Sequence, residues 1–415
     1  MKLPMEPLVL LATTYRWFST ARLAMAFRDS GAIIDAVCPA GHPIGVTSAA
    51  RRLYRYHGLA PLASLGHAIA SSRPDIIIPC DDLTRAHLHR MYEGLTQPGS
   101  NDEALRILLE RSLGDPAGYP IIDTRSGLIA LANELAIKAP ETAVVSSVEQ
   151  VRQWIATLGT PLVLKTDGTS GGIGVKIASS EAEAVHAFEL LNSPPRLLRT
   201  VKRAIVDQDR TLLLPWLQRR RPVINVQRFL PFADATIAVA CWQGKVLASI
   251  SVEVMRTWKT KGPASLVRLI DNSDMQQAAL KLTKHLRLSG LCGFDFVLDE
   301  DTGEAHLIEM NPRATQTCHL ALGRGSNLTA ALTAAIAGQP VPDLPSITQS
   351  KVIALFPLEW QNDPSSPYLR SAYHDVPWEE PQLVQACVES RMRNGGLLTY
   401  DNLNRIRRRL FRNRA

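Results

Sequence analysis

Two acidic residues on neighbouring strand-like segments are the side chains of this sequence best suited to chemistry. Asp295 lies in the segment 293–298, and Glu309 and Asn311 lie in the segment 306–313, with a short acidic turn between the two segments. Side chains of a strand alternate between its faces, so Glu309 and Asn311 share one side. If the chain reverses at the turn, we expect Asp295 to lie opposite Glu309.

Such a pairing of carboxylates needs a compensating positive charge. Like charges directly opposite each other destabilise a strand pair, and an unpaired buried carboxylate is costly. The flanking apolar residues predict that the other face of the hairpin is buried; they are Phe294, Phe296, Ile308 and Met310. Mg²⁺ binds in proteins through one or two carboxylates together with substrate phosphates. The hairpin therefore predicts a site for a metal and a nucleotide, with a solvated hairpin edge as the alternative.

A glycine-rich segment provides a second candidate element. Lys165 stands at the end of a predicted strand, four glycines follow within the range 168–174, and another strand comes next. Glycine lets backbone amides approach a phosphate without a Cβ in the way. The pattern G-x-x-x-x-G-K-[ST] is absent from the sequence, so this is not a Walker A loop. We interpret the segment as a phosphate-contacting strand–loop–strand unit, although alone it could be a flexible hairpin without chemistry.

Length and composition indicate a folded protein of several domains. A chain of 415 residues is expected to form two or three domains, and 46% hydrophobic with 20% charged residues is ordinary globular composition. Six arginines near the C-terminus account for most of the net charge of +7, which leaves the main body nearly neutral. Nucleic-acid binding by the main body is therefore not expected. The basic tail is suited to contacting an anionic membrane, RNA or an acidic partner, or it is simply solvated.

The cysteines and the N-terminal segment indicate where in the cell the protein is expected. The six cysteines are scattered without a Cys-x-x-Cys pattern, which argues against a zinc site or a disulfide framework and fits reduced, cytoplasmic thiols. The apolar run at residues 8–12 is too short to span a membrane and lacks a cleavage site of small residues. The sequence therefore predicts neither export nor a transmembrane segment.

Alternating strand and helix signals fill the first 118 residues and predict an α/β domain with a parallel sheet. A G-x-G-x-x-G pattern does not follow the first strand, so a dinucleotide fingerprint is absent. Asp81 and Asp82 follow a strand end, where open α/β sheets bind ligands, but capping of the next helix is the favoured interpretation. The signals are strands at 8–13, 33–38 and 75–79 and a helix at 19–29.

Three further segments are expected after this domain. Residues 119–222 contain the glycine-rich loop, and residues 223–340 are rich in strand signals and contain the acidic hairpin. Residues 341–415 are rich in proline with isolated tryptophans, which is typical of a strap packed on a larger domain or of a partner-binding segment. The basic loop at 256–265 could grip an anionic substrate or face solvent, and its basic residues are Arg256, Lys259 and Lys261.

Taken together, these elements resemble the ATP-grasp superfamily of carboxylate-amine and carboxylate-thiol ligases, and in particular the carbamoyl-phosphate synthetase large chain. The resemblance covers about residues 120–320. It rests on Lys165 with its glycine loop, on the segment Gln227-Arg228-Phe229-Leu230 followed by Asp234, and on Glu-Met-Asn-Pro-Arg at 309–313. It implies a mixed α/β and α+β architecture, in which an ATP-grasp fold follows a Rossmann-like pre-ATP-grasp domain.

The resemblance also implies a role for each matching position. Arg125 and Lys165 would contact the phosphates of ATP, and Gly171, Gly172 and Gly174 would form a lid over them. The hinge that meets adenine would be Gln227, Arg228, Phe229 and Leu230, and Asp234 would hold the ribose. The ligands of Mg²⁺, or of Mn²⁺ as an alternative, would be Asp295, Glu309 and Asn311. Arg313 would act in catalysis with Lys165 by stabilising the transferred phosphoryl group or an acyl phosphate.

Two departures from the family patterns narrow the expected function. Gly293 stands where the D-alanine ligase branch has an arginine, so Arg313 must carry that role, as in the Asn-Pro-Arg pattern of carbamoyl-phosphate synthetase relatives. An Ala-Met-Lys-Met biotinyl motif is absent from the sequence, which disfavours a biotin-dependent carboxylase subunit.

The expected activity is an ADP-forming, ATP- and Mg²⁺-dependent ligation. The enzyme would activate a carboxylate as an acyl phosphate and join it to an amine, with an amino acid or a small metabolite as substrate. A homodimer would be compatible with this function. The alternatives are a kinase or carboxylase on the same scaffold, and a nucleotide-sensing or scaffold protein without catalysis.

Overall fold

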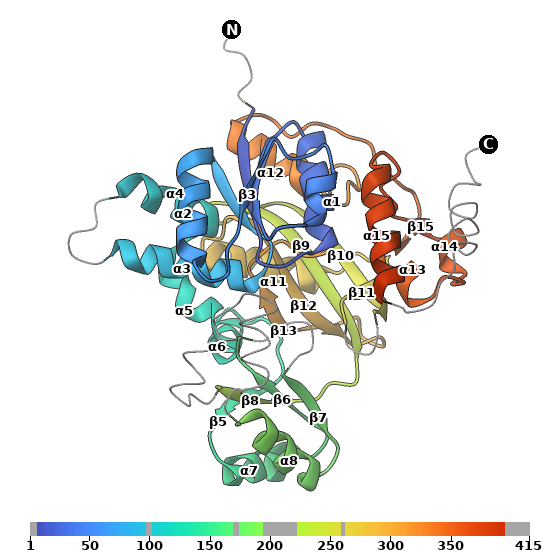
Figure 1. Cartoon of the computed structure of the whole chain (residues 1–415). Helices are drawn as coiled ribbons and strands as arrows, with labels where there is room; N and C mark the ends of the chain where they lie inside the picture. The colour runs from blue at the N-terminus through green and yellow to red at the C-terminus, as the bar shows by residue number, and fades with distance from the viewer. Residues whose placement is uncertain (1–5, 97–101, 169–173, 194–221, 259–261, 395–415) are drawn as a thin grey trace.

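The computed structural model describes residues 6–96, 102–168, 174–193, 222–258 and 262–394, and these form three sheets (Figure 1). The N-terminal sheet is parallel, as the sequence predicts, and its strand order is β3-β2-β1-β4. Its strands are β1 (Leu8–Ala12), β2 (Ile33–Cys38), β3 (Arg52–Arg55) and β4 (Ile76–Pro79). Its helices are α1 (Phe18–Asp29), α2 (Pro61–Ser72), α3 (Asp82–Leu95) and α4 (Glu103–Leu113).

A small antiparallel sheet lies at the opposite end of the molecule from the N-terminal sheet (Figure 1). Its strands, in spatial order, are β5 (Thr142–Val145), β8 (Ile224–Arg228), β6 (Leu162–Thr166) and β7 (Val175–Ala178). The helices α7 (Val148–Leu158) and α8 (Glu181–Leu191) cover one face of this sheet and share a hydrophobic core with it. Two helices precede it, α5 (Tyr119–Ile122) and α6 (Arg125–Glu134).

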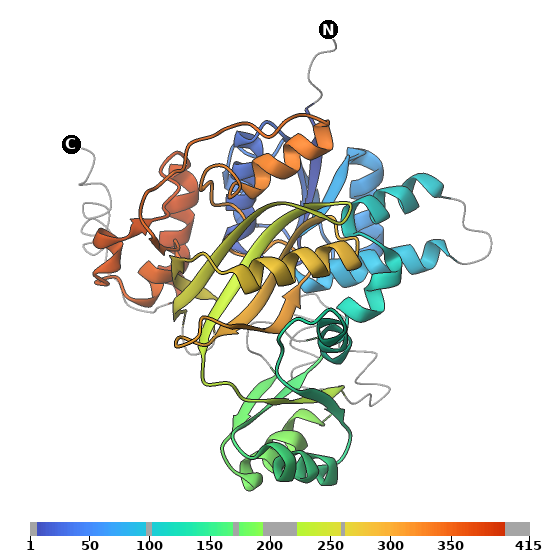
Figure 2. The ribbon, with the colours of Figure 1, turned by 180° about the vertical axis from the view of Figure 1, so that it is seen from behind.

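The third sheet has seven strands and forms the centre of the molecule. In spatial order they are β13 (Ala305–Asn311), β12 (Gly290–Leu298), β9 (Ala233–Trp242), β10 (Lys245–Thr257), β11 (Ala264–Leu269), β14 (Val352–Ala354) and β15 (Tyr373–His374). Helix α11 (Ser273–His285) packs with α6 on one face, as the view from behind shows for α11 (Figure 2). Helix α12 (Leu328–Ala337) and the N-terminal domain pack on the other face.

The segment after α12 is part of this central body. Strand β14 pairs with β11, β15 pairs with β14, and three helices accompany them: α13 (Leu358–Asn362), α14 (Tyr368–Ser371) and α15 (Pro381–Asn394). Three carboxylates of this segment form ion pairs with arginines of earlier elements. They are Glu359 with Arg256 at 3.1 Å, Glu380 with Arg28 at 3.1 Å, and Asp375 with Arg22. The described residues therefore support the interpretation of the segment as a packed strap.

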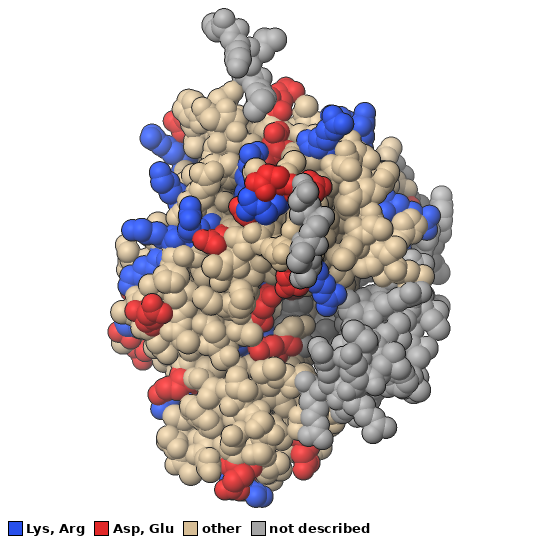
Figure 3. All heavy atoms as spheres, turned by 90° about the vertical axis from the view of Figure 1, so that its left-hand side faces the viewer, with Lys and Arg blue, Asp and Glu red and all other residues tan. Residues whose placement is uncertain are grey.

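The described part of the chain also bears on the expected distribution of charge and on the expectation about transmembrane segments. On the face shown in Figure 3, acidic residues are interspersed among the lysines and arginines. Among the described helices, none combines the length and apolar character needed to cross a bilayer.

Candidate functional site

A cavity of about 2280 Å³ lies where elements of all three sheets meet. Its lining includes most of the residues that the sequence singles out: Lys165, Gln227, Arg228, Phe229, Leu230, Asp234, Asp295, Glu309, Asn311 and Arg313. Arg125 and Gly174 are described but do not line it, while Gly171 and Gly172 lie outside the described residues. Residues far apart in the sequence are thus gathered around one space.

The acidic hairpin has the predicted register at its functional end. Asp295 pairs with Glu309, but the next pair is Phe296 with Leu307, so β13 contains one extra residue, Ile308. Such a bulge shifts the alternation of side chains along the strand. Ile308 lines the cavity, whereas Leu307 is fully buried in the core.

The prediction that Ile308 belongs to the buried opposite face is therefore wrong. A bulge depends on how two strands pair, and the strand's own sequence does not reveal it. The same prediction is confirmed for Phe294, Phe296 and Met310, which are buried in the core, although Phe296 also touches the cavity.

The pair of carboxylates has the unfavourable electrostatics that the sequence predicts. Burial raises the pKa of Asp295 to about 6, and the charge of Glu309 contributes in the same direction. Hydrogen bonds from Thr236 and Asn311 and the charge of Arg313 oppose this rise in pKa. The amide Nδ2 of Asn311 donates to Asp295 Oδ2 at 2.8 Å.

These side chains fit a hard divalent cation by donor type. Carboxylate and amide oxygens are the ligands that Mg²⁺ prefers, and a cation would relieve the repulsion between the two carboxylates. Within the described ranges, no three His, Cys, Asp or Glu side chains come together as a metal cluster. The candidate ligands are therefore two carboxylates, Asp295 and Glu309, assisted by the amide of Asn311.

Lys165 is the residue before the last of β6 and lies beside this acidic group. Its side chain is buried, and burial lowers its pKa to about 8. The charges of Glu309, Asp295 and Asp234 oppose this lowering, which places Lys165 in the field of three carboxylates. Burial likewise raises the pKa of Asp234, with the charge of Lys165 acting against the rise. A buried amine among acidic groups is suited to holding phosphate oxygens.

Arg125 links the two sides of the site. It is the first residue of α6, and its Nη2 donates to Glu309 Oε1 at 2.8 Å. Its Nη1 donates to the carbonyl oxygen of Thr166 at 2.5 Å, and its backbone N–H donates to Asp167 Oδ1 at 3.3 Å. The residue predicted to contact phosphate is thus bonded directly to a predicted metal ligand, Glu309.

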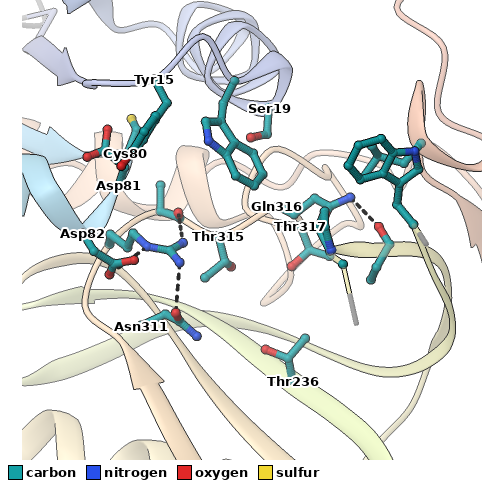
Figure 4. A pocket seen from close by; sticks show the side chains of 18 of the residues that line it. Tyr15, Ser19, Cys80, Asp81, Asp82, Thr236, Asn311, Thr315, Gln316 and Thr317 are labelled. Carbon is teal, nitrogen blue, oxygen red and sulfur yellow. Dashed lines mark hydrogen bonds and ion pairs between the residues drawn. The ribbon is translucent and has the colours of Figure 1, made fainter. Parts of the chain in front are cut away.

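Arg313 is held from two domains (Figure 4). Its Nη2 donates to Asn311 Oδ1 at 3.0 Å, and its Nε lies 3.0 Å from Asp82 Oδ1 at the start of α3. Two acidic neighbours in the N-terminal domain therefore differ in role. Asp81 caps α3 by accepting from the Thr84 N–H at 2.8 Å, which confirms the capping interpretation, whereas Asp82 orients Arg313.

The hinge segment lies beside the cavity as well. The Gln227 side chain is buried and donates to Thr142 Oγ1 at 2.8 Å, and Arg228 forms an ion pair with Glu141 at 2.7 Å. The Arg228 backbone N–H also donates to the Glu141 carbonyl oxygen at 2.9 Å, so side chains and backbone together join β8 to the start of β5. The predicted contact with adenine would use backbone groups, so it stays a prediction.

The basic loop has a structural contact at its one described basic residue. Arg256 pairs with Glu359 and lies over the ring of Tyr368, with 5.4 Å from its guanidinium carbon to the ring centroid. Arg256 therefore fits neither alternative, since its guanidinium contacts other residues of the protein and is not simply solvated. Lys259 and Lys261 lie outside the described residues.

Sequence reasoning missed the loop that follows Arg313. Thr315, Gln316 and Thr317 line the cavity, and Gln316 Nε2 donates to the carbonyl oxygen of Ala264 at 2.6 Å. His319 holds the far end of this loop, with its Nδ1 2.9 Å from the Gln316 carbonyl oxygen and its Nε2 2.6 Å from Asp375 Oδ2. Only the place of this loop in the sequence could have pointed to it, because it directly follows the strand that contains Glu309 and Asn311.

Comparisons with known proteins bear on the family and the fold of the chain. Residues 220–355 match a family described as ATP-grasp in the biosynthetic pathway with Ter operon. The carbamoyl phosphate synthase large chain of Methanothermobacter thermautotrophicus is 25% identical over 231 residues, which are 55% of this chain and 19% of that protein. The chain therefore spans about a fifth of the length of this curated relative.

Two solved structures are similar to most of the chain. The N5-carboxyaminoimidazole synthase from Aspergillus clavatus, in complex with ADP and 5-aminoimidazole ribonucleotide, has a TM-score of 0.58 at 15% identity, covering 82% of this chain and 80% of that one. The biotin carboxylase from Campylobacter jejuni has a TM-score of 0.57 at 12% identity, covering 82% and 72%. Residues 220–355 thus match an ATP-grasp family, most of the chain shares the fold of these solved structures, and the predicted fold is confirmed.

Proposed function

We propose that this protein is an ATP- and Mg²⁺-dependent ligase that activates a carboxylate as an acyl phosphate and joins it to an amine. The observation that carries the proposal is the convergence of basic and acidic groups on one cavity. Lys165 reaches it from the small sheet, and Asp295, Glu309, Asn311 and Arg313 reach it from the hairpin side. A carboxylate is a poor electrophile, and phosphorylation gives it a good leaving group.

In the proposed reaction, a carboxylate oxygen of the substrate attacks the γ-phosphorus of ATP and ADP leaves. The amine nitrogen then attacks the acyl carbon, inorganic phosphate leaves, and the nitrogen loses a proton. Lys165 would neutralise phosphate charge during transfer, and Arg313 would hold the carboxylate and then the acyl phosphate. Such catalysis depends on positioning and electrostatics, so a dedicated protein nucleophile is not required.

The ligands that would hold Mg²⁺ are Asp295, Glu309 and Asn311, because their oxygens suit this ion and the two carboxylates repel each other without it. When bound, the ion would offset negative charge on the phosphates. Arg125 would keep Glu309 oriented through their ion pair, which also ties this ligand to the small sheet. Asp82 would orient Arg313 in the same way from the N-terminal domain.

A carboxylase is the second candidate, because the solved relatives described above are a carboxyaminoimidazole synthase and a biotin carboxylase. A screen of carboxylates, bicarbonate and amines for ADP and phosphate release separates the two functions. The ligase forms an amide from the organic acid, and the carboxylase depends on bicarbonate. A kinase would release ADP without free phosphate, and a scaffold protein would release neither.

The metal assignment is tested by Glu309→Gln, with Glu304→Gln as the matched control. Glu309 lines the cavity, whereas Glu304 pairs with Lys138 outside it. We expect Glu309→Gln to lower phosphate release by at least about a hundredfold, the scale on which loss of one electrostatic contact acts in an active site. Thermal unfolding should stay cooperative in both variants. Unchanged turnover in Glu309→Gln would remove the metal assignment.

A further inference from the structure

The cavity extends well beyond the groups proposed to hold phosphate and metal. Its volume of about 2280 Å³ exceeds the roughly 300–1,000 Å³ of a typical small-molecule site. Part of its lining comes from the N-terminal domain, including Tyr15 and Trp17 between β1 and α1 and Ser19 in the first turn of α1. The space can therefore take a second substrate of considerable size beside ATP.

The N-terminal side of this space exposes aromatic surface. Tyr15 is 37% exposed and Trp17 is 43% exposed, and both line the cavity. Two aliphatic residues that line the same side, Val46 and Leu53, are 38% and 48% exposed. Large apolar side chains gathered in a cavity and left open to solvent mark a surface that a ligand covers.

Polar groups stand opposite this aromatic surface. Figure 4 shows Tyr15 and Ser19 on the N-terminal side and Thr315, Gln316 and Thr317 across from them. These three residues continue the chain from Arg313, so the polar side begins at the cation proposed to hold the reacting carboxylate.

A second cation lies between the two aromatic residues in the chain. The Nε of Arg16 donates to the Ala40 carbonyl oxygen at 2.7 Å, and Arg16 lines the cavity. Within the described residues, no carboxylate lies at ion-pair distance from Arg16. The space thus combines a flat apolar wall with cationic and hydrogen-bonding groups.

We propose that the carboxylate substrate is an organic acid with an aromatic body. Its ring packs on Trp17 and Tyr15, and its carboxylate reaches Arg313 past the hydroxyl and amide groups of residues 315–317. This inference rests on the proposed ligase function and specifies its substrate. Bicarbonate, acetate or glycine would leave the aromatic wall in water, so such small acids gain nothing from it.

The test uses the full chain with ATP, Mg²⁺ and hydroxylamine, which replaces the unknown amine. Hydroxylamine nitrogen attacks the acyl phosphate, phosphate leaves and a stable hydroxamate forms, so each activated acid is detected by its own mass. The probes are benzoate, 3-phenylpropionate and indole-3-acetate, compared with acetate, glycine and bicarbonate. We expect hydroxamate and ADP in equal amounts from at least one aromatic acid, and much less ADP with the small acids.

Variants of Trp17 then test the wall itself. Trp17→Ala should raise the KM for the aromatic acid about tenfold, since a stacking contact is worth an amount of that order. The KM for ATP should stay unchanged, and Trp17→Phe should restore most of the affinity. Leu280→Ala is the matched control, because Leu280 is 45% exposed on α11 and does not line the cavity.

The outcomes distinguish failure of the aromatic specificity from failure of the ligase function. Small acids that work as well as aromatic ones, or a KM that Trp17→Ala leaves unchanged, would overturn the aromatic specificity while the ligase function stands. Absence of ADP with every acid would overturn the ligase function and this inference with it.

Discussion

The small sheet and the rest of the molecule differ in how they are held together. Residues of the N-terminal domain, the central sheet, α12, β14 and α15 belong to one hydrophobic core; examples are Phe27, Ile250, Leu332, Ile353 and Leu383. The small sheet has a separate core with α7 and α8, in which Leu164 and Phe188 are buried. We call these two parts the large body and the small unit. Because the small unit has a core of its own, we expect it to unfold separately from the large body.

The candidate site lies at the joint between them. Lys165 belongs to the small unit, whereas Asp295 and Glu309 belong to the large body. Arg125 contacts both sides, and Lys138 pairs with Asp274 at 3.4 Å and with Glu304 at 2.7 Å. Any rotation of the small unit therefore changes the separation between the basic and acidic groups of the site. The basic and acidic groups of the site are therefore held by parts with separate cores.

The largest expected effect separates the two cores. Phe27→Ala removes a fully buried ring from the large body, and Phe188→Ala removes a ring that is 3% exposed from the small unit. Each should cost about 3–5 kcal/mol of the stability of its own part. In calorimetry, Phe27→Ala should lower the main unfolding transition, whereas Phe188→Ala should lower a separate, smaller transition.

Hydrogen exchange locates these effects along the chain. Protection should fall throughout the large body in Phe27→Ala and only in residues 142–168, 174–191 and 224–228 in Phe188→Ala. A single transition that both variants lower equally would show that the two parts unfold together, and would remove the comparison.

The division into two parts could be predicted only in outline from the sequence. The first α/β domain and the pairing of Asp295 with Glu309 follow from strand periodicity and a short turn. The position of Ile308 could not be predicted, because a bulge arises from pairing between strands. Strand β14 has three residues, too few to show a period, so its place beside β11 could not be predicted either.

The site shows a similar limit. The metal pattern and Lys165 are recognisable because their residue types are unusual at strand ends. Asp82, Tyr15 and Trp17 carry no motif, and their part in the cavity depends on how the N-terminal domain packs on the central sheet. The one available signal was that they follow the carboxyl ends of parallel strands, where ligands bind in open sheets.

Acid should destabilise the large body. Burial lowers the pKa of His42 and of His374 to about 4, so both stay neutral in the folded protein at pH values where the unfolded chain is protonated. Their contribution to stability is present above pH 6.5 and is lost as the pH falls toward 4. Between pH 7 and pH 5, each of the two histidines should lower the free energy of unfolding by about 2 kcal/mol, since one pKa unit corresponds to about 1.4 kcal/mol.

The measurement is urea unfolding of the main transition at a series of pH values. The double variant His42→Gln, His374→Gln should lose most of this pH dependence, even if its stability at pH 7 is lower. An unchanged slope of stability against pH in the double variant would assign the acid effect to other groups.

The smallest expected effect concerns the exposed contacts at the joint. The Lys138 side chain is 45% exposed and forms two ion pairs, and exposed ion pairs contribute little to stability. Lys138→Ala should leave both unfolding transitions unchanged within error. A marked fall of either transition would mean that surface charge couples the small unit to the large body more tightly than the separate cores indicate.

The strap formed by the last described segment has a consequence for synthesis. Glu359 accepts from Arg256 and Ser265, and Asp375 bonds to His319 and Arg22, so this segment fixes elements that surround the candidate site. While the ribosome is still translating the preceding part, those partners do not yet exist. We therefore expect a nascent chain to lack the complete cavity until residues 352–394 have been translated.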